Sequence, residues 1–271
     1  MLVVAVVTGV GGMGVACARR VGAGRHLVLA DFDQTKLDGV AETFVADGFT
    51  VSPLRVDVSD RASVDELAAA VGAIGTLRTL VHTAGLSPTQ AAADRVLEVD
   101  MLGTDHVLAA FLDLVTEGTV AVCIASMAGY MAGFTPDQER AFATVATDDL
   151  MGELADVDLG DFGATYTIAK RINHLRVEQA AVTWGQRGGR VVSISPGIIS
   201  TPMTHQELAE GSGEQMRGML GISPVPRIGT AEDIAAAVQW LASADASFVS
   251  GCDLRVDGGV TAAIRGLMAA G

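Results

Sequence analysis

Short hydrophobic runs alternate with longer, alanine-rich amphipathic stretches from the first residues of the chain almost to the last. The runs are rich in β-branched residues and end at Gly, Asp or Ser, which is typical of buried strands, and the stretches between them have helical spacing. This alternation predicts a parallel sheet. We expect strands at Leu2–Val7, His26–Ala30, Thr50–Val56, Leu77–His82, Thr119–Ile124, Arg190–Ile194 and Asp253–Val256.

Seven strands with helices between them indicate an α/β fold. We expect residues 1–271 to form one Rossmann-like domain, a doubly wound parallel sheet with helices on both faces. The sequence shows no internal repeat and no low-complexity linker. Ligands of such sheets bind beyond the carboxyl ends of the strands, where the strand order reverses. Residues that directly follow a strand are therefore the first candidates for a site.

The composition narrows the possible partners. Hydrophobic residues make up 49% of the 271 residues, enough for a full core, and the formal net charge is -14 at pH 7. A phosphate backbone or an anionic membrane surface is bound by clustered Lys and Arg, so we expect neither nucleic acid nor a membrane as partner. A charge of this sign and size favours solubility.

The three cysteines stand singly, at Cys17, Cys123 and Cys252. They lack the paired spacing of a disulfide framework or a metal site, so no metal is expected and a reducing, cytoplasmic location fits. The longest apolar stretches have strand length, and the first leads directly into a glycine turn without a basic segment or cleavage site. We therefore expect neither a signal peptide nor a membrane span.

A glycine-rich turn, TGVGGMG, follows the first strand and opens a helix. Gly9, Gly12 and Gly14, with Met13 between them, allow the backbone to approach a pyrophosphate at the helix N-terminus. The same turn is also compatible with a tight strand-to-helix connection that binds nothing. The end of the second strand favours the dinucleotide.

Asp31 ends the second strand, 22 positions after Gly9, where a dinucleotide-binding fold places an acid that binds the adenosine ribose hydroxyls. A carboxylate there repels a 2′-phosphate, and the adjacent Phe32 offers that phosphate no cation. NAD is therefore expected as the cofactor in preference to NADP. A helix cap or a turn acid is the alternative role for Asp31.

Two further strand ends add cofactor-binding candidates. The third strand ends in RVDVSD, where Asp57 and Val58 are expected near the adenine and Asp60 is a candidate helix cap. A single histidine such as His82, after the fourth strand, is more often structural than catalytic. The candidates that follow it in the HTAG motif are Thr83, Ala84 and Gly85.

The chain has two tyrosines and two lysines, and one of each lies in YTIAK, at Tyr166 and Lys170. Residues four apart share a helix face. A nearby cation favours the phenolate and lowers the pKa of a tyrosine by about 1–3 units, so that the phenolate can take a proton from an alcohol. The alternative is a surface tyrosine and a solvated lysine that are helical neighbours.

In this order, TGVGGMG, Asp31, Asp57, HTAG, CIASMAG, YTIAK and SPGIIST make the chain resemble the short-chain dehydrogenase/reductase family from residue 2 to about Gly259. The resemblance implies that Tyr166 is the catalytic acid/base, that Lys170 lowers its pKa and binds the nicotinamide ribose, and that Ser126 holds the substrate oxygen. It also implies that the nicotinamide is lined by Pro196, Gly197, Ile199 and Thr201.

Three features depart from the family pattern. The glycine turn is one residue shorter than TGxxxGxG, and HTAG stands in place of NNAG. Asp100, in EVDMLGT, takes the place of an asparagine that holds a water against the lysine. Every residue supplies a backbone carbonyl, so Asp100 is a fourth catalytic candidate if that group holds the water, whereas a role of the side-chain amide would be impaired.

The implied reaction is direct hydride transfer between NAD and a secondary alcohol or a ketone, with Tyr166 as the general base. A bulky apolar substrate such as a steroid or terpenoid alcohol is expected, and the resemblance implies a homodimer or homotetramer. Two alternatives stay open. One is a dinucleotide-binding sensor or scaffold without turnover, and the other is an NADPH-dependent ketone or acyl-thioester reductase.

The 39 residues between Ser126 and Tyr166 are more than related enzymes usually have. This insertion, at about 131–162, is expected to contain two helices, with Pro136 first in one and Thr147 or Asp148 capping the other. It either remodels a subunit interface, roofs the substrate pocket or is a solvated decoration. The residues expected to pack on the body are Phe142, Val145, Leu150 and Leu154.

The stretch at about 202–222 is a second candidate for substrate selection. It contains Met203, Met216, Met219 and Leu220. Such side chains suit either a mobile lid over a bulky apolar substrate or ordinary core packing.

Overall fold

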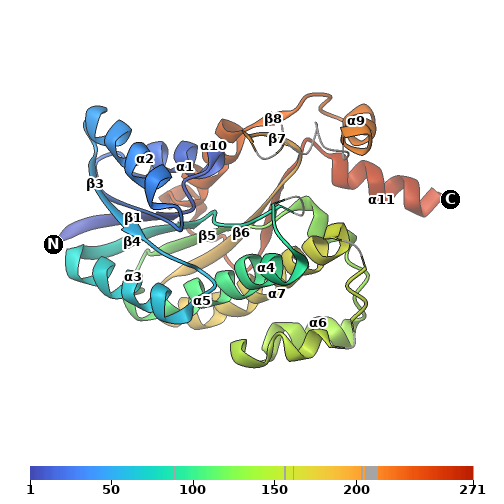
Figure 1. The fold of residues 1–271 in the computed structure, drawn as a ribbon, viewed down its shortest axis with the longest axis horizontal. Helices are drawn as coiled ribbons and strands as arrows, with labels where there is room; N and C mark the ends of the chain where they lie inside the picture. The colour runs from blue at the N-terminus through green and yellow to red at the C-terminus, as the bar shows by residue number, and fades with distance from the viewer. Residues whose placement is uncertain (88–89, 156, 161, 203, 205–212, 271) are drawn as a thin grey trace.

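A computed structural model describes residues 1–87, 90–155, 157–160, 162–202, 204 and 213–270. Its main sheet has seven parallel strands in the order β3-β2-β1-β4-β5-β6-β9 (Figure 1), which confirms the predicted α/β fold. The strands are β1 (Leu2–Thr8), β2 (His26–Asp31), β3 (Thr50–Arg55), β4 (Gly75–His82), β5 (Val120–Ile124), β6 (Arg190–Pro196) and β9 (Asp253–Val256).

The predicted strand ends differ from the observed ones by at most two residues, at the start of β4 and at the end of β6. Gly75 lies opposite Leu2, and Pro196 lies opposite Val256. The backbone pairing thus continues past the hydrophobic runs from which the strands were predicted, because a strand end needs a paired backbone but not a large hydrophobic side chain.

Helices cover both faces of the sheet (Figure 1). On one face, Phe44 and Leu29 belong to a fully buried core, and on the other face Phe111 and Leu80 belong to a second one. The helices of the first face are α1 (Gly12–Val21), α2 (Gln34–Ala46) and α10 (Ala231–Leu241), and those of the second are α3 (Arg61–Ile74), α4 (Ala93–Val96), α5 (Gly103–Ala110) and α7 (Phe162–Gly185).

The strand order reverses between β1 and β4, since β2 and β3 extend the sheet to one side of β1, and β4, β5, β6 and β9 extend it to the other. Thr8, the last residue of β1, lies opposite His82 at the end of β4. Parallel strands place their carboxyl ends at one edge, so the loops after β1, β2, β4, β5 and β6 converge there. This edge carries the residues predicted to form the site.

The insertion begins with α6 (Pro136–Thr144), which Thr135 caps in a capping box with Gln138, so the predicted role of Pro136 is confirmed. The predicted second helix is wrong: two 3₁₀ turns follow instead, η4 (Thr147–Asp149) and η5 (Gly152–Leu154). No side chain caps η4. Thr147 donates its hydroxyl to Asp105 of α5 at 2.5 Å, and this tertiary hydrogen bond takes the place of the predicted cap.

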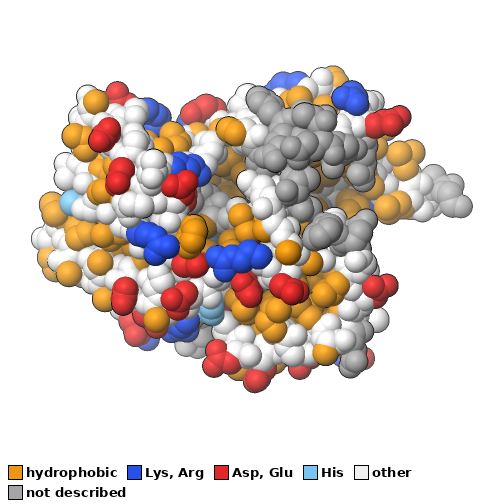
Figure 2. All heavy atoms as spheres, viewed as in Figure 1, with side chains coloured by type: hydrophobic (Ala, Val, Ile, Leu, Met, Phe, Trp, Pro, Cys, Tyr) orange, Lys and Arg blue, Asp and Glu red, His pale blue; other side chains and the backbone are white. Residues whose placement is uncertain are grey.

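Phe142, Leu150 and Leu154 of the insertion are buried against α7 and the π-helical turn η1 (Leu97–Leu102), whereas Val145 is only partly buried. The expected packing of one face of the insertion on the body is confirmed for Phe142, Leu150 and Leu154. In Figure 2, acidic side chains edge a hydrophobic area on the side of the molecule where α6 lies in Figure 1. The first turn of α6 carries acidic side chains, Asp137 and Glu139.

The sequence did not indicate a small second sheet, in which β7 (Ile199–Ser200) pairs with β8 (Gly229–Thr230). It lies near α9 (Gly213–Ile222) and α11 (Val260–Ala270), and α11 projects from the body at the C-terminal end (Figure 1). Two-residue strands are too short to give a hydrophobic period. No helix within the described ranges combines the length and apolarity that a membrane crossing requires.

Candidate functional site

The glycine turn after β1 packs too tightly for side chains. Gly9 has φ +84°, a conformation that favours glycine, and its amide donates to the Ala30 carbonyl at 2.7 Å. A Cβ on Gly14 would lie 1.8 Å from the Gly9 carbonyl oxygen, and one on Gly9 would lie 2.5 Å from the Ala84 amide nitrogen. The shortened turn therefore still needs two of its glycines for backbone approach.

The N-terminus of α1 is open toward the edge of the sheet. Gly11 at its N-cap offers no side-chain hydrogen bond, so the first amides of the helix are available to an anion such as a pyrophosphate. Gly12 faces Thr201, whose methyl carbon would lie 3.4 Å from a Cβ at Gly12, and Met13 packs on the core behind. The loops after β1 and β6 thus face each other across this helix end.

Asp31 holds the glycine turn in place. Its carboxylate accepts hydrogen bonds from the Val10 amide at 2.7 Å and from the Asp33 amide at 3.0 Å, and its side chain is 14% exposed. Asp33, not Asp31, caps α2. The lone pairs left on the carboxylate can accept ribose hydroxyls, as the predicted role requires.

Two cations lie near Asp31, and the sequence did not single them out. Lys36 of α2 places its Nζ 3.6 Å from Asp31, and the Arg55 guanidinium lies over the exposed Phe32 ring, 4.7 Å from its centroid. Phe32 itself offers a 2′-phosphate no cation, as expected, but Lys36 and Arg55 lie close by. Arg55 is the last residue of β3, and nothing in the sequence around it indicates a binding role. Only the pairing of β3 with β2 brings it over Phe32.

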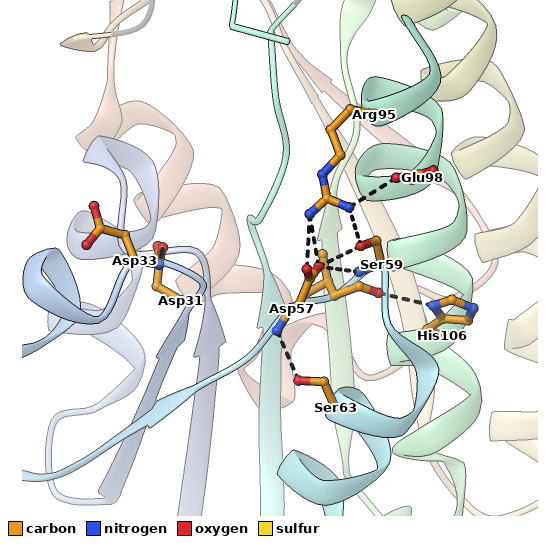
Figure 3. A network of polar contacts seen from close by, with 9 residues as sticks. Asp31, Asp33, Asp57, Ser59, Ser63, Arg95, Glu98 and His106 are labelled. Carbon is orange, nitrogen blue, oxygen red and sulfur yellow. Dashed lines mark hydrogen bonds and ion pairs between the residues drawn. The ribbon is translucent and has the colours of Figure 1, made fainter. Parts of the chain in front are cut away.

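Asp57 lies in a polar network with Arg95, a residue that the sequence did not single out (Figure 3). Arg95 of α4 donates to both carboxylate oxygens at 3.1 and 3.2 Å, and the Ser59 hydroxyl donates to one of them at 2.6 Å. Desolvation opposes ionisation, but the hydrogen bonds from Ser59 and Arg95 outweigh it and lower the pKa of Asp57. An adenine amino group would have to share this carboxylate with Arg95.

The neighbours of Asp57 have structural partners. The Val58 carbonyl is bonded to His106 Nδ1 at 3.1 Å (Figure 3), and Val58 packs against Gly103. Asp60 accepts from the Ala62 amide, which confirms it as the cap of α3. The loop after β3 is therefore held to the helices beside it before any cofactor binds.

The HTAG segment closes the gap between β1 and β4. Thr83 donates its hydroxyl to the carbonyls of Thr8 and Gly9 at 2.9 and 2.7 Å. His82 is 1% exposed and bonded to the Thr8 hydroxyl at 2.7 Å, and burial, with the nearby Lys170, lowers its pKa to about 3. A neutral, buried His82 matches the structural role that was predicted for it.

Ser126 stands at the end of β5, where it caps the 3₁₀ turn η3 (Met127–Met131) by accepting from the Ala128 amide at 3.1 Å. This turn docks on α7 through Gly129. A Cβ on Gly129 would lie 2.8 Å from the Lys170 carbonyl carbon and 2.9 Å from the Arg171 amide. The close contact brings the Ser126 turn against the helix that carries YTIAK, and the sequence reasoning overlooked Gly129.

Tyr166 and Lys170 occupy one face of α7, as their spacing predicted. The Lys170 Nζ lies 5.4 Å from the centroid of the Tyr166 ring, which is partly exposed, whereas Lys170 is 4% exposed. The solvated lysine of the alternative interpretation is therefore excluded. A buried cation at this distance favours the phenolate form of the tyrosine.

Asp100 places its side chain, not only its carbonyl, beside Lys170. The Lys170 Nζ lies 3.0 Å from Asp100 Oδ2, and Oδ1 accepts the Leu86 amide at 2.7 Å. A Cβ on Gly85 would lie 3.3 Å from both charged groups, so the last residue of HTAG covers the pair. The Asp100 backbone carbonyl accepts the Thr104 hydroxyl at 2.8 Å.

The stretch after β6 meets the same edge. Pro196 is buried, the Gly197 amide donates to Val256, and Ile199 and Thr201 are 5% and 8% exposed. A cavity of about 150 Å³ lies beside Gly197 and Ile199, and Leu220 of α9 forms part of its wall. Met203 lies outside the described residues, while Met216 and Met219 are partly buried. The position of Leu220 in the cavity wall is compatible with either of the two roles expected for this stretch.

The three cysteines are protonated thiols near neutral pH, because the pKa of each is raised. Burial raises the pKa of both Cys17 and Cys123 to about 12, and all three cysteines are free thiols. Among the described residues, no group of three or more His, Cys, Asp or Glu has the arrangement of a metal site. Tyr166, Lys170 and Asp100 are the titratable side chains of the predicted site that lie together in the structure.

Comparison with protein families gives two adjoining matches. Residues 3–136 match the model described as short chain dehydrogenase, and residues 151–261 match the one described as Enoyl-(Acyl carrier protein) reductase. Only the central part of the insertion lies between the two matches. The core of the fold, from β1 to the start of α11, is thus typical of one family.

Curated relatives cover nearly the whole chain. The short-chain dehydrogenase/reductase bsc3 of Alternaria brassicicola is 34% identical over 95% of each chain. A galactitol 2-dehydrogenase (L-tagatose-forming) of Cereibacter sphaeroides is 30% identical, over 95% of this chain and 94% of that one. A 3beta-hydroxysteroid dehydrogenase 1 of Eggerthella lenta is 28% identical, over 92% and 90%.

Solved structures share the fold. The 3-alpha-hydroxysteroid dehydrogenase from Pseudomonas sp. B-0831, determined as a complex with NADH, superposes with a TM-score of 0.79 over 97% of this chain and 98% of that one, at 24% identity. At this identity the likeness establishes the architecture alone.

Proposed function

Because the chain belongs to the short-chain dehydrogenase/reductase family, we propose that it is an NAD-dependent enzyme that interconverts a secondary alcohol and a ketone by direct hydride transfer. The similarity to curated dehydrogenases supports an oxidoreductase that acts on alcohols or ketones. The proposal of hydride transfer with an acid–base step rests on one observation. The buried Lys170 lies beside the partly exposed Tyr166, on the helix against which the Ser126 turn packs.

The chain's own residues supply the acid–base step. When bound, the nicotinamide supplies the hydride acceptor. The Ser126 hydroxyl donates a hydrogen bond to the substrate oxygen, and Tyr166 takes the hydroxyl proton as the carbonyl forms. Lys170 stabilises the phenolate of Tyr166 before this transfer, and Tyr166 is neutral once it holds the proton. General base help of this kind is worth about 10²–10⁴-fold in rate.

The cofactor is held by the groups that converge at the switch point. The amides at the start of α1 bind the pyrophosphate, Asp31 binds the adenosine ribose, and Thr201 meets the nicotinamide carboxamide. Open helix amides and a carboxylate with free lone pairs support this assignment. Asp31 disfavours a 2′-phosphate by charge repulsion, which is why we propose NAD.

A second candidate is an NADPH-dependent reductase of ketones or acyl thioesters. Lys36 and Arg55 stand where they could attract a 2′-phosphate, and the family model over residues 151–261 is described as an Enoyl-(Acyl carrier protein) reductase. Asp31 opposes this candidate because its carboxylate, 3.6 Å from the Lys36 Nζ and bonded to the Val10 amide, repels a 2′-phosphate. Parallel calorimetric titrations with NADH and NADPH distinguish the two: tighter binding of NADPH would overturn the NAD proposal.

The substrate is proposed to be a bulky apolar secondary alcohol, such as a steroid or terpenoid alcohol. A hydroxysteroid dehydrogenase among the relatives supports this choice. A galactitol dehydrogenase among them makes a polar alcohol the alternative substrate class. A panel that contains both kinds of alcohol therefore tests the substrate class directly.

The experiment follows the absorbance of the reduced nicotinamide with NAD and this panel. We expect NADH formation with one apolar alcohol and a loss of at least about 100-fold in Tyr166→Phe, with NAD binding retained. Tyr130→Phe is the matched control, since it removes the chain's other tyrosine hydroxyl, which donates to Asp253 at 2.8 Å. Ordinary activity in Tyr166→Phe would refute the mechanism. No turnover with any alcohol, together with NAD binding, would favour a sensor or scaffold.

We also propose a cytoplasmic homodimer or homotetramer. Three free cysteines support a reducing location. The insertion covers apolar side chains of α7, among them Ile168 and Ile172, which are 6% and 0% exposed. A subunit contact on that side of α7 would therefore include the insertion itself. Light scattering of the full chain and of a variant without residues 136–158 tests whether the insertion determines the number of subunits.

A further inference from the structure

A carboxylate is buried next to the lysine of YTIAK. Asp100 is 0% exposed and Lys170 is 4% exposed, and their charged atoms lie 3.0 Å apart. At this position the family pattern has a neutral asparagine. The buried cation beside Tyr166 therefore has a second, fully ionic neighbour in this chain.

The fold holds Asp100 in this contact from two sides. The side chain accepts the Leu86 amide through Oδ1, and the backbone carbonyl accepts the Thr104 hydroxyl one turn later. Asp100 lies in the π-helical turn η1, a wider turn of the kind often found at functional sites. The carboxylate thus has a fixed position and cannot turn to solvent.

The other titratable groups around Lys170 carry no charge near neutral pH. His82 from β4 has its pKa lowered to about 3, and Cys123 from β5 has its pKa raised to about 12, in both cases mainly by burial. His174, one helical turn further along α7, has its pKa lowered to about 4 by burial. Among the described residues that face Lys170, Asp100 is the only carboxylate.

The charges of the pair depend on each other. Burial favours the neutral forms of both groups, and it raises the pKa of Asp100 despite the neighbouring cation. For Lys170 the attraction of Asp100 and Tyr166 outweighs burial, so its pKa is raised. The charged form of each partner is therefore favoured by the other, while burial opposes both.

We propose that Asp100 is a positioning residue that competes with Tyr166 as the counterion of Lys170 and so sets the pH at which Tyr166 ionises. The proposal rests on the function proposed above, since it concerns the acid–base step of that function. A lysine with a full counterion 3.0 Å away attracts a phenolate less than a lysine paired only with a neutral amide. The enzyme would then need a higher pH for alcohol oxidation than it would with asparagine at position 100.

The chain allows a direct test without cofactor or substrate, because it has only two tyrosines. Tyrosinate absorbance is titrated against pH in the native protein and in Asp100→Asn. Burial, with the nearby Asp253, raises the pKa of Tyr130 to about 12, so Tyr130 ionises last. Tyr166→Phe removes the other signal and identifies it. We expect Asp100→Asn to lower the midpoint of Tyr166 by about one pH unit.

Matched variants separate charge from structure. Glu98→Gln removes one negative charge from the same turn but away from Lys170, since Glu98 pairs with Arg95, and it should leave the midpoint unchanged. Asp100→Glu keeps the charge and should stay near the native midpoint. Asp100→Ser removes the charge with a smaller side chain, in case the amide is not tolerated, and circular dichroism checks the folded state of each variant.

An unchanged midpoint in both Asp100→Asn and Asp100→Ser would overturn the proposal. A raised midpoint would overturn it as well, because it would mean that Lys170 loses its proton without Asp100. The titration does not depend on turnover. A failure to find an oxidised alcohol would therefore count against the proposed function and leave this result standing.

Discussion

Phe142 tests whether the insertion is part of the folded body. Its ring is 1% exposed, lies 4.8 Å from that of Phe134, and belongs to the apolar cluster that joins α6 to η1 and α7. Phe142→Ala would remove this ring from a site with little room to collapse, because η1 and α7 also belong to the sheet-covering layer. Replacing a buried Phe by Ala typically costs about 3–5 kcal/mol.

The insertion also has polar anchors that the substitution leaves in place. Arg176 of α7 donates to the Val145 carbonyl at 2.7 Å and forms an ion pair with Asp105 of α5, and Arg171 pairs with Glu139. These contacts limit how far α6 can move. The cavity can therefore collapse little, and we expect the upper part of the range, a loss of about 4–5 kcal/mol in the free energy of unfolding.

The assay is urea unfolding of Phe142→Ala and of Phe248→Ala, followed by circular dichroism. Phe248 is fully exposed, so the same chemical change there should alter the free energy of unfolding by less than about 0.5 kcal/mol. Limited proteolysis shows whether cleavage begins within residues 136–155, as expected if α6 detaches first. Equal unfolding curves and equal cleavage for the two variants would refute the packing of the insertion on the body.

Two more predictions follow from the cofactor half. Gly14→Ala would push a methyl group into the Gly9 carbonyl oxygen, 1.8 Å away, so we expect calorimetry to show loss of NAD binding; native affinity would contradict the tight turn. Arg95→Met removes the ion pair that lowers the pKa of Asp57. A group with a lowered folded pKa stabilises the protein above its unfolded value, near pH 4, and loses this contribution as the pH falls through its folded value. Arg95→Met should thus reduce the free energy of unfolding by up to about 1 kcal/mol at pH 7. The difference from the native protein should shrink as the pH falls below the unfolded value, and a difference that stays constant would exclude this ion pair as its cause.

Local sequence patterns accounted for the sheet and for the pairs that lie close in the chain. The strands follow from their hydrophobic runs, the glycine turn from its spacing, and the shared face of Tyr166 and Lys170 from helical geometry. The cap of α6 at Thr135 and Pro136 is equally local. Such features depend on residues within one or two turns, so the sequence alone determines them.

Patterns in the insertion were less informative. Residues after Thr144 have acids and small side chains in no clear period, and the structure forms two 3₁₀ turns there in place of the predicted helix. Thr147 was expected to cap a helix and instead bonds Asp105, which lies 42 residues earlier. The competing tertiary hydrogen bond decided the local conformation.

Contacts between distant segments were decided only by the tertiary structure. Arg95 reaches Asp57 from another helix, Arg55 lies over Phe32 from a neighbouring strand, and Asp100 meets Lys170 across 70 positions. The sequence alone determined which of these side chains are charged and on which helix, strand or loop each one lies. The packing of those elements decided which charges meet in a buried place, because attraction and desolvation depend on separation in space and on burial, neither of which has a local signature.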